Sequence, residues 1–144
     1  MDRITIAVRL VRASGVLLVA LGIVHLIATP HIPHLLDASP AVAAIATGPT
    51  VLNHVLVGVL LLPLGYTTWL AAPAARAGER WARRVLVANA AAVAALPISI
   101  VLFMRGARYF TAPLFVAGVA LVGAAATTLA VAVWLVLSAG DRRS

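Results

Sequence analysis

Four histidines are the residues of this sequence best suited to chemistry, and all lie between positions 25 and 54. They are His25, His31, His34 and His54, and Asp37 lies among them. Imidazole nitrogens bind Zn, Cu, Fe and Ni, and a carboxylate can complete such a ligand set. Because the sequence has no cysteine, thiolate sites are excluded. The grouping therefore predicts a transition-metal site, for Zn or Cu, that draws on these five residues.

A haem b between two of the histidines is the second possible cofactor. His25 and His54 are each expected about one turn, roughly 5 Å, from the same end of two antiparallel helices. Helical bundles hold cofactors between facing helices, and Gly58 would leave space beside His54. Arg105 and Arg108 are then candidates for binding the haem propionates or another anion, because guanidinium pairs well with carboxylate and phosphate. The alternative for both arginines is contact with lipid phosphates.

Two other interpretations of the histidines stay open. Imidazoles near a membrane surface can be hydrated or can donate to carbonyls that a nearby proline leaves free, which gives them a purely structural role. They can also relay protons, because the ordinary pKa of histidine is close to physiological pH.

The elements that position these residues are membrane-spanning helices. Hydrophobic residues make up 63% of the 144-residue chain and charged residues 10%, with a mean hydropathy of +1.08. Soluble domains are about 45–50% apolar and about 25% charged, and a domain of this size buries only part of its surface. Both a soluble enzyme and a nucleic-acid-binding module are therefore excluded. Four segments are long enough to cross a hydrocarbon core, and backbone in lipid must be helical to satisfy its polar groups. They cover about residues 7–29, 51–72, 84–104 and 113–138.

These segments predict one all-α membrane domain over residues 1–144, folded as an up-down bundle of four helices. The first segment is expected to be an uncleaved helix and not a signal peptide, because no A-x-A cleavage site follows it.

Small residues allow close helix packing in lipid. His54, Gly58 and Gly65 share one face of the second helix. The third helix carries a stripe of alanines, Ala88, Ala91, Ala92 and Ala95, which is expected to pack inside the bundle. Five further polar residues are expected to add interhelical hydrogen bonds: Thr67, Thr68, Asn89, Thr127 and Thr128.

The distribution of arginine predicts how the helices are oriented. In an up-down bundle, the N-terminus, the connection between the second and third segments and the C-terminus lie on one side of the membrane. Nine of the 11 arginines are in these three regions, and the connections on the opposite side hold only Arg105 and Arg108. By the positive-inside rule, both termini are cytoplasmic and the histidines lie on the outer face. The net charge of +7 then reflects how the helices are oriented in the membrane. We therefore expect the lipid bilayer as a partner, and no nucleic acid. Arginine without lysine, in an alanine- and valine-rich chain, suggests a bacterial cytoplasmic membrane.

The first outer loop is expected to contain a short helix at the membrane surface. Ser39 suits an N-cap, Pro40 the first helical position and Gly48 the C-terminal stop. Residues 41–47 between them are apolar. This helix could cover the histidines as a lid, and the alternative is an ordinary connector that lies on the membrane.

The sequence assigns no catalytic residue and does not decide whether the protein is an enzyme. It lacks a buried carboxylate pair, a nucleophile elbow and a phosphate-binding loop. The leading hypothesis is a small membrane protein whose outer histidines bind a transition metal or haem, as a redox or metal-handling component. One alternative is a non-catalytic accessory or scaffold subunit, in a homo-oligomer or a larger membrane complex. Another is a bundle that binds a lipid or a small apolar molecule.

Overall fold

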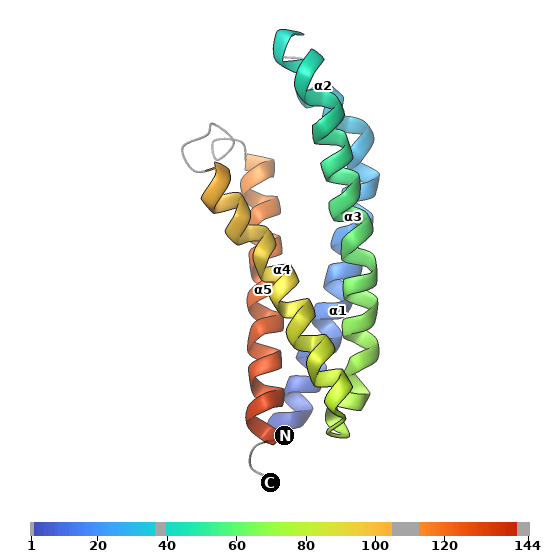
Figure 1. Cartoon of the computed structure of the whole chain (residues 1–144), viewed down its shortest axis with the longest axis vertical. Coiled ribbons are helices and arrows are strands. Elements are labelled where there is room, and N and C mark those ends of the chain that lie inside the picture. The colour runs from blue at the N-terminus through green and yellow to red at the C-terminus, as the bar shows by residue number, and fades with distance from the viewer. Residues whose placement is uncertain (1, 37–39, 105–112, 141–144) are drawn as a thin grey trace.

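The computed structural model describes residues 2–36, 40–104 and 113–140, and every element in these ranges is a helix (Figure 1). The four long helices are α1 (Arg3–Ala28), α3 (Pro40–Arg76), α4 (Arg80–Met104) and α5 (Pro113–Gly140). Four helical stretches are long and apolar enough to cross a membrane: Thr47–Arg76, Arg80–Phe103 and Phe115–Ala139 lie within α3, α4 and α5, and Arg3–His34 covers α1 and continues beyond its end at Ala28. The prediction of an all-α chain with four helices of membrane-spanning length is confirmed.

The start of α1 is fixed by Asp2, whose carboxylate accepts a hydrogen bond from the Thr5 backbone N–H at 2.9 Å. This N-cap satisfies one of the amide groups that the first turn of a helix leaves unpaired. Hydrogen bonds from the Thr5 side chain and from its backbone N–H lower the pKa of Asp2 below its ordinary value, and Arg76 adds to the effect. The contribution of Arg76 indicates that the end of α3 lies close to the start of α1.

A tight turn at Gly78 joins α3 to α4. The Glu79 N–H donates to the Ala74 carbonyl at 3.0 Å, and the Gly78 N–H donates to the Ala75 carbonyl at 3.1 Å. This hydrogen-bond pair ends the helix as a Schellman motif, in which the residue after the cap takes a positive φ. Gly78 has a φ of 84°, and it is the only described residue with a positive φ. The motif returns the chain at once into α4.

The connection between α1 and α3 differs from the sequence prediction. A short 3₁₀ turn, Thr29–His31, and the five-residue helix α2 (Ile32–Leu36) follow α1 directly. The helix expected over residues 41–47 is not separate, because α3 begins at Pro40 and continues without interruption through Gly48 and Pro49. Neither residue stops the helix: Gly48 keeps a negative φ, and an internal proline, although it removes one hydrogen bond and crowds the carbonyl four residues earlier, is tolerated in membrane helices. Ser39 lies outside the described residues.

Two helix pairs make up the fold, and they meet most closely near the end that holds the N-terminus (Figure 1). α1 and α3 lie side by side, α5 packs against α1 and α4, and the C-terminal end of α5 lies near the start of α1. Among the described residues, buried side chains occur on α4 only up to Val93 and on α5 only from Val122 onward. The two helix pairs are therefore packed together only over the part of the fold nearer the N-terminus. The largest buried side chains at the centre are Leu18, Leu61, Leu86 and Leu129.

The packing face of α4 is not the alanine stripe that the sequence suggested. Ala88, Ala91, Ala92 and Ala95 are all exposed. The face turned inward is formed by Ala82, Leu86, Asn89 and Val93. The prediction that the stripe packs inside the bundle is wrong, because larger apolar groups together with Asn89 fill the interior instead.

Asn89 forms the main polar contact between helices in the buried part of the fold. Its side-chain amide lies 2.9 Å from the Thr67 Oγ1, 2.9 Å from the Thr68 Oγ1 and 3.1 Å from the Leu64 carbonyl oxygen. Both threonine hydroxyls donate back to carbonyls of α3, so they accept from the amide. The expectation of interhelical hydrogen bonds is therefore confirmed for these three residues, whereas the Thr127 and Thr128 hydroxyls donate within α5, to the Gly123 and Ala124 carbonyls.

Candidate functional site

The candidate site lies where α1 and α3 are held together by two pairs of glycines. A Cβ atom on Gly15 would lie 2.8 Å from the Gly65 carbonyl oxygen, and one on Gly22 would lie 2.8 Å from the Gly58 carbonyl oxygen. Each helix carries its two glycines seven residues apart, and the pairs match in opposite order along the chain. The helices therefore run antiparallel with their backbones in contact, which small residues permit in membrane helices.

His25 and His54 face each other one turn beyond the Gly22–Gly58 contact. Their rings stack with centroids 4.6 Å apart and an interplanar angle of 28°. His25 lies three residues after Gly22, and His54 lies four residues before Gly58. Because i+3 and i+4 neighbours share a helix face, the glycine contact brings the two imidazoles together. Both side chains are half-buried.

Hydrogen bonds set the same tautomer in both rings. The His25 Nδ1 lies 3.0 Å from the Leu21 carbonyl oxygen, which can only accept, so His25 donates from Nδ1. The Thr29 hydroxyl donates its proton to the His25 carbonyl at 2.8 Å. It must therefore accept from the His54 Nδ1, 3.1 Å away. In their neutral forms, both imidazoles carry the proton on Nδ1 and keep the lone pair on Nε2.

Each of these hydrogen bonds is of the kind that metal-binding histidines make through their second ring nitrogen. A ligating imidazole usually donates its second nitrogen to a carbonyl or another oxygen, which fixes the ring and makes the ligating nitrogen more basic. Leu21 and Thr29 supply those oxygens here. In the Nδ1–H tautomer, these hydrogen bonds leave the Nε2 lone pair of each ring unused.

The structure does not unite all the predicted ligands. Within the described ranges, no group of three or more His, Cys, Asp or Glu residues is placed to hold a metal ion. His31 ends the 3₁₀ turn and His34 lies in α2, so neither joins His25 and His54 in such a group. Asp37 lies outside the described residues, as do Arg105 and Arg108.

A haem does not fit between His25 and His54 in this arrangement. Two axial imidazoles would have to lie on opposite faces of the porphyrin, with the iron between their ligating nitrogens. The two rings are instead stacked directly against each other, with centroids 4.6 Å apart. No space for a macrocycle is left between them.

Sequence reasoning missed two contributors to this site. Gly15 and Gly22 were not recognised as the partners of Gly65 and Gly58, although the seven-residue spacing on both helices was a visible signal. Thr29 was also missed, because its link to His54 depends on a contact between residues 25 positions apart. Comparison of the chain with protein-family models, with characterised proteins and with solved structures finds no match.

Proposed function

We propose that this chain is an integral membrane protein that binds a transition-metal ion, Zn²⁺ or Cu²⁺, through the Nε2 atoms of His25 and His54. The observation that carries the proposal is the shared tautomer: both rings donate from Nδ1, so both Nε2 lone pairs are available. Imidazole suits these metals, and two protein ligands leave further positions to water or to a transported or reacting group.

The proposed topology places the site on the outer face of a bacterial cytoplasmic membrane. The four helices would cross alternately, with both termini in the cytoplasm, as the nine arginines on one side and two on the other favour. His25 and His54 would then lie near the outer surface, where a metal ion can enter from water. In this arrangement, His31 and His34 would line the approach to the pair and need not ligate the ion.

Metal analysis of the purified full chain tests the proposal. Protein loaded with Zn²⁺ or Cu²⁺ and then freed of excess ions should retain about one ion per chain, as measured by elemental mass spectrometry. The double substitution His25→Ala/His54→Ala should abolish retention, while His31→Ala, a control in the same region, should keep it. Metal retention by the double variant, or none by the wild type, would disprove the site.

An accessory or scaffold role is the second candidate, and one observation favours it. The alanine stripe of α4 is exposed, as are several large apolar residues of the same helix. Small-residue faces are those through which membrane helices approach partners. Cross-linking in membranes, with a bulky substitution such as Ala92→Trp as the test and Val131→Trp, at an exposed position of α5, as the control, would detect a partner or a second copy on this face.

A further inference from the structure

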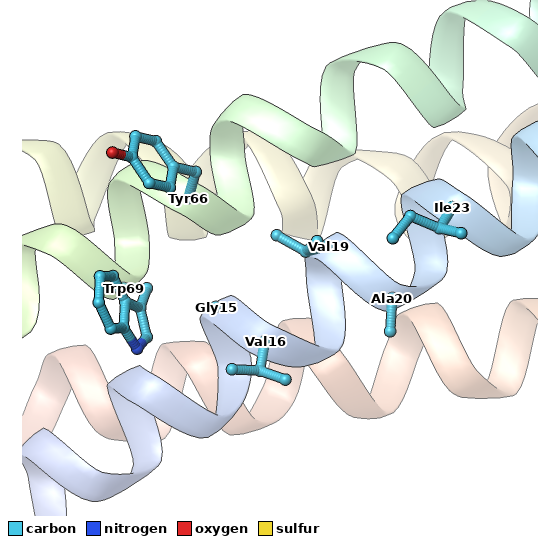
Figure 2. Close-up of a pocket in the computed structure, with 7 residues that line it drawn as sticks. All are labelled: Gly15, Val16, Val19, Ala20, Ile23, Tyr66 and Trp69. Carbon is cyan, nitrogen blue, oxygen red and sulfur yellow. The ribbon is translucent and has the colours of Figure 1, made fainter.

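An open apolar groove lies on the surface formed by α1 and α3, on the half of the molecule that carries the arginines. It has a volume of about 460 Å³, and its lining includes Val16, Ala20 and Ile23 from α1 and Tyr66 and Trp69 from α3 (Figure 2). Figure 2 shows the two aromatic rings at the end of the groove nearer the start of α1. Tyr66 and Trp69 are 57% and 45% exposed, so the groove opens outward and is not part of the core.

Two arginines continue the same face of α1 beyond the groove. Arg12, Val16 and Ile23 are spaced i, i+4 and i+11, and Arg9 precedes Arg12 by three residues, so all four share one side of the helix. Both arginines are exposed. The groove end is fixed by Trp69, because a Cβ on Gly15 would lie 2.9 Å from the Trp69 Cβ. Arg12 is three residues from Gly15, which is about 5 Å along the helix axis.

Seven described arginines at this end of the molecule outnumber its two described acids, Asp2 and Glu79. The Asp2 carboxylate accepts from Thr5 and interacts with Arg76, and the Glu79 carboxylate accepts from the Trp81 indole. Arg9 and Arg12 therefore present positive charge at the arginine-rich end of an apolar groove. An amphiphile with a phosphate head and a hydrocarbon tail has the complementary order of groups.

We propose that this groove binds an anionic phospholipid, with an acyl chain along Val16 to Ile23 and the phosphate on Arg9 and Arg12. The groove extends over nine residues of α1, from Gly15 to Ile23, or about 12 Å, which an extended acyl chain can follow. Guanidinium groups bind phosphate with two parallel hydrogen bonds, and an indole beside them suits the headgroup region. Basic sites between membrane helices bind anionic headgroups in this way. The proposal rests on insertion into a membrane and is independent of the histidine pair.

Native mass spectrometry of the full chain, released from detergent with equal amounts of phosphatidylglycerol and phosphatidylcholine of identical chains, tests the site. The wild type should retain the anionic lipid in excess, by roughly tenfold. Arg9→Gln/Arg12→Gln should remove the preference. Arg80→Gln/Arg84→Gln removes the same charge from exposed arginines at the start of α4 and should leave the preference intact.

A groove-filling variant separates this site from diffuse attraction of lipid by charge. Ala20 lines the groove and is exposed, so Ala20→Phe should fill the groove without disturbing the core and should lower retention of both lipids severalfold. Circular dichroism and the thermal midpoint would verify folding. The proposal fails if the Arg80/Arg84 variant loses the preference as fully as the Arg9/Arg12 variant. It fails equally if folded Ala20→Phe protein retains both lipids as the wild type does.

Discussion

Gly22 and Gly58 meet so closely that a Cβ atom on Gly22 would lie 2.8 Å from the Gly58 carbonyl oxygen. One turn farther along the two helices, the same close approach lets His25 and His54 stack. The packing of the backbones and the geometry of the candidate metal site therefore depend on one contact. Any change that separates the helices here should separate the imidazoles as well.

The substitution Gly22→Ala tests this dependence. The new methyl group would lie closest to a backbone atom, the Gly58 carbonyl oxygen at 2.8 Å, and next to the Leu62 Cδ2 at 3.1 Å. Because the backbone cannot turn aside as a side chain can, the helices must move apart, at a cost of about 1–3 kcal/mol in the free energy of unfolding. Metal affinity should fall with it, because the two Nε2 atoms diverge. Thermal unfolding in detergent and titration calorimetry measure the two effects.

Gly118→Ala is the matched control for that experiment. Nothing lies within 4 Å of a Cβ at Gly118, so the substitution meets open space. Alanine is the better helix former by up to about 1 kcal/mol, and stability should stay equal or rise. If Gly22→Ala behaved like this control in both assays, the glycine contact would not be what positions the histidines.

Thr29 should tune the metal site without touching the metal. Thr29→Val keeps the shape of the side chain but removes the oxygen that accepts from the His54 Nδ1. Loss of such a partner typically lowers metal affinity by about 10- to 100-fold. Thr29→Ser retains the hydroxyl and should restore most of the affinity. Imidazole nitrogen chemical shifts would show whether His54 leaves the Nδ1–H tautomer in the valine variant, and an unchanged tautomer and affinity would refute the assigned role.

Asn89 should matter for stability and not for metal binding. Asn89→Ala leaves the Thr67 and Thr68 hydroxyls without their interhelical donor. Hydrogen bonds between membrane helices contribute roughly 0.6–1.7 kcal/mol, so the free energy of unfolding should drop by about 1 kcal/mol. Asn53→Ala, at an exposed position of α3, should change it by less than about 0.5 kcal/mol. Equal effects of the two substitutions on the unfolding midpoint would contradict the role of Asn89.

The first turn of α1 should depend on pH through Asp2. Its pKa is lowered in the folded protein, so the N-cap stabilises the helix start fully above the ordinary aspartate pKa. That stabilisation is lost as the pH falls through the lowered pKa, because the protonated carboxyl accepts less well from Thr5. Hydrogen exchange at the Thr5 amide should accelerate over that window, after correction for the intrinsic pH dependence. Asp2→Asn should retain a cap and remove the pH dependence, and a response identical to the wild type would exclude Asp2 as its source.

The sequence by itself determined the class of this protein and the residues worth testing. The four apolar stretches predict helices of membrane-spanning length because backbone in lipid has no other partner, and the structure contains such helices. The sequence also identified His25 and His54 as a candidate pair, since antiparallel helices bring residues at equal distance from one end of the bundle to the same depth in the membrane. The interhelical role of Asn89 was predictable from its polarity within an apolar stretch.

Only the tertiary structure decided which faces meet. Exposed and buried stripes look alike in a membrane helix, because lipid and protein interior are both apolar, and so the alanine stripe of α4 could not be assigned to one or the other. The pairing of Gly22 with Gly58, and of Thr29 with His54, joins residues 36 and 25 positions apart and depends on the register of two helices. That register gives both imidazoles one tautomer and stacks their rings with centroids 4.6 Å apart, so that no space for a haem lies between them.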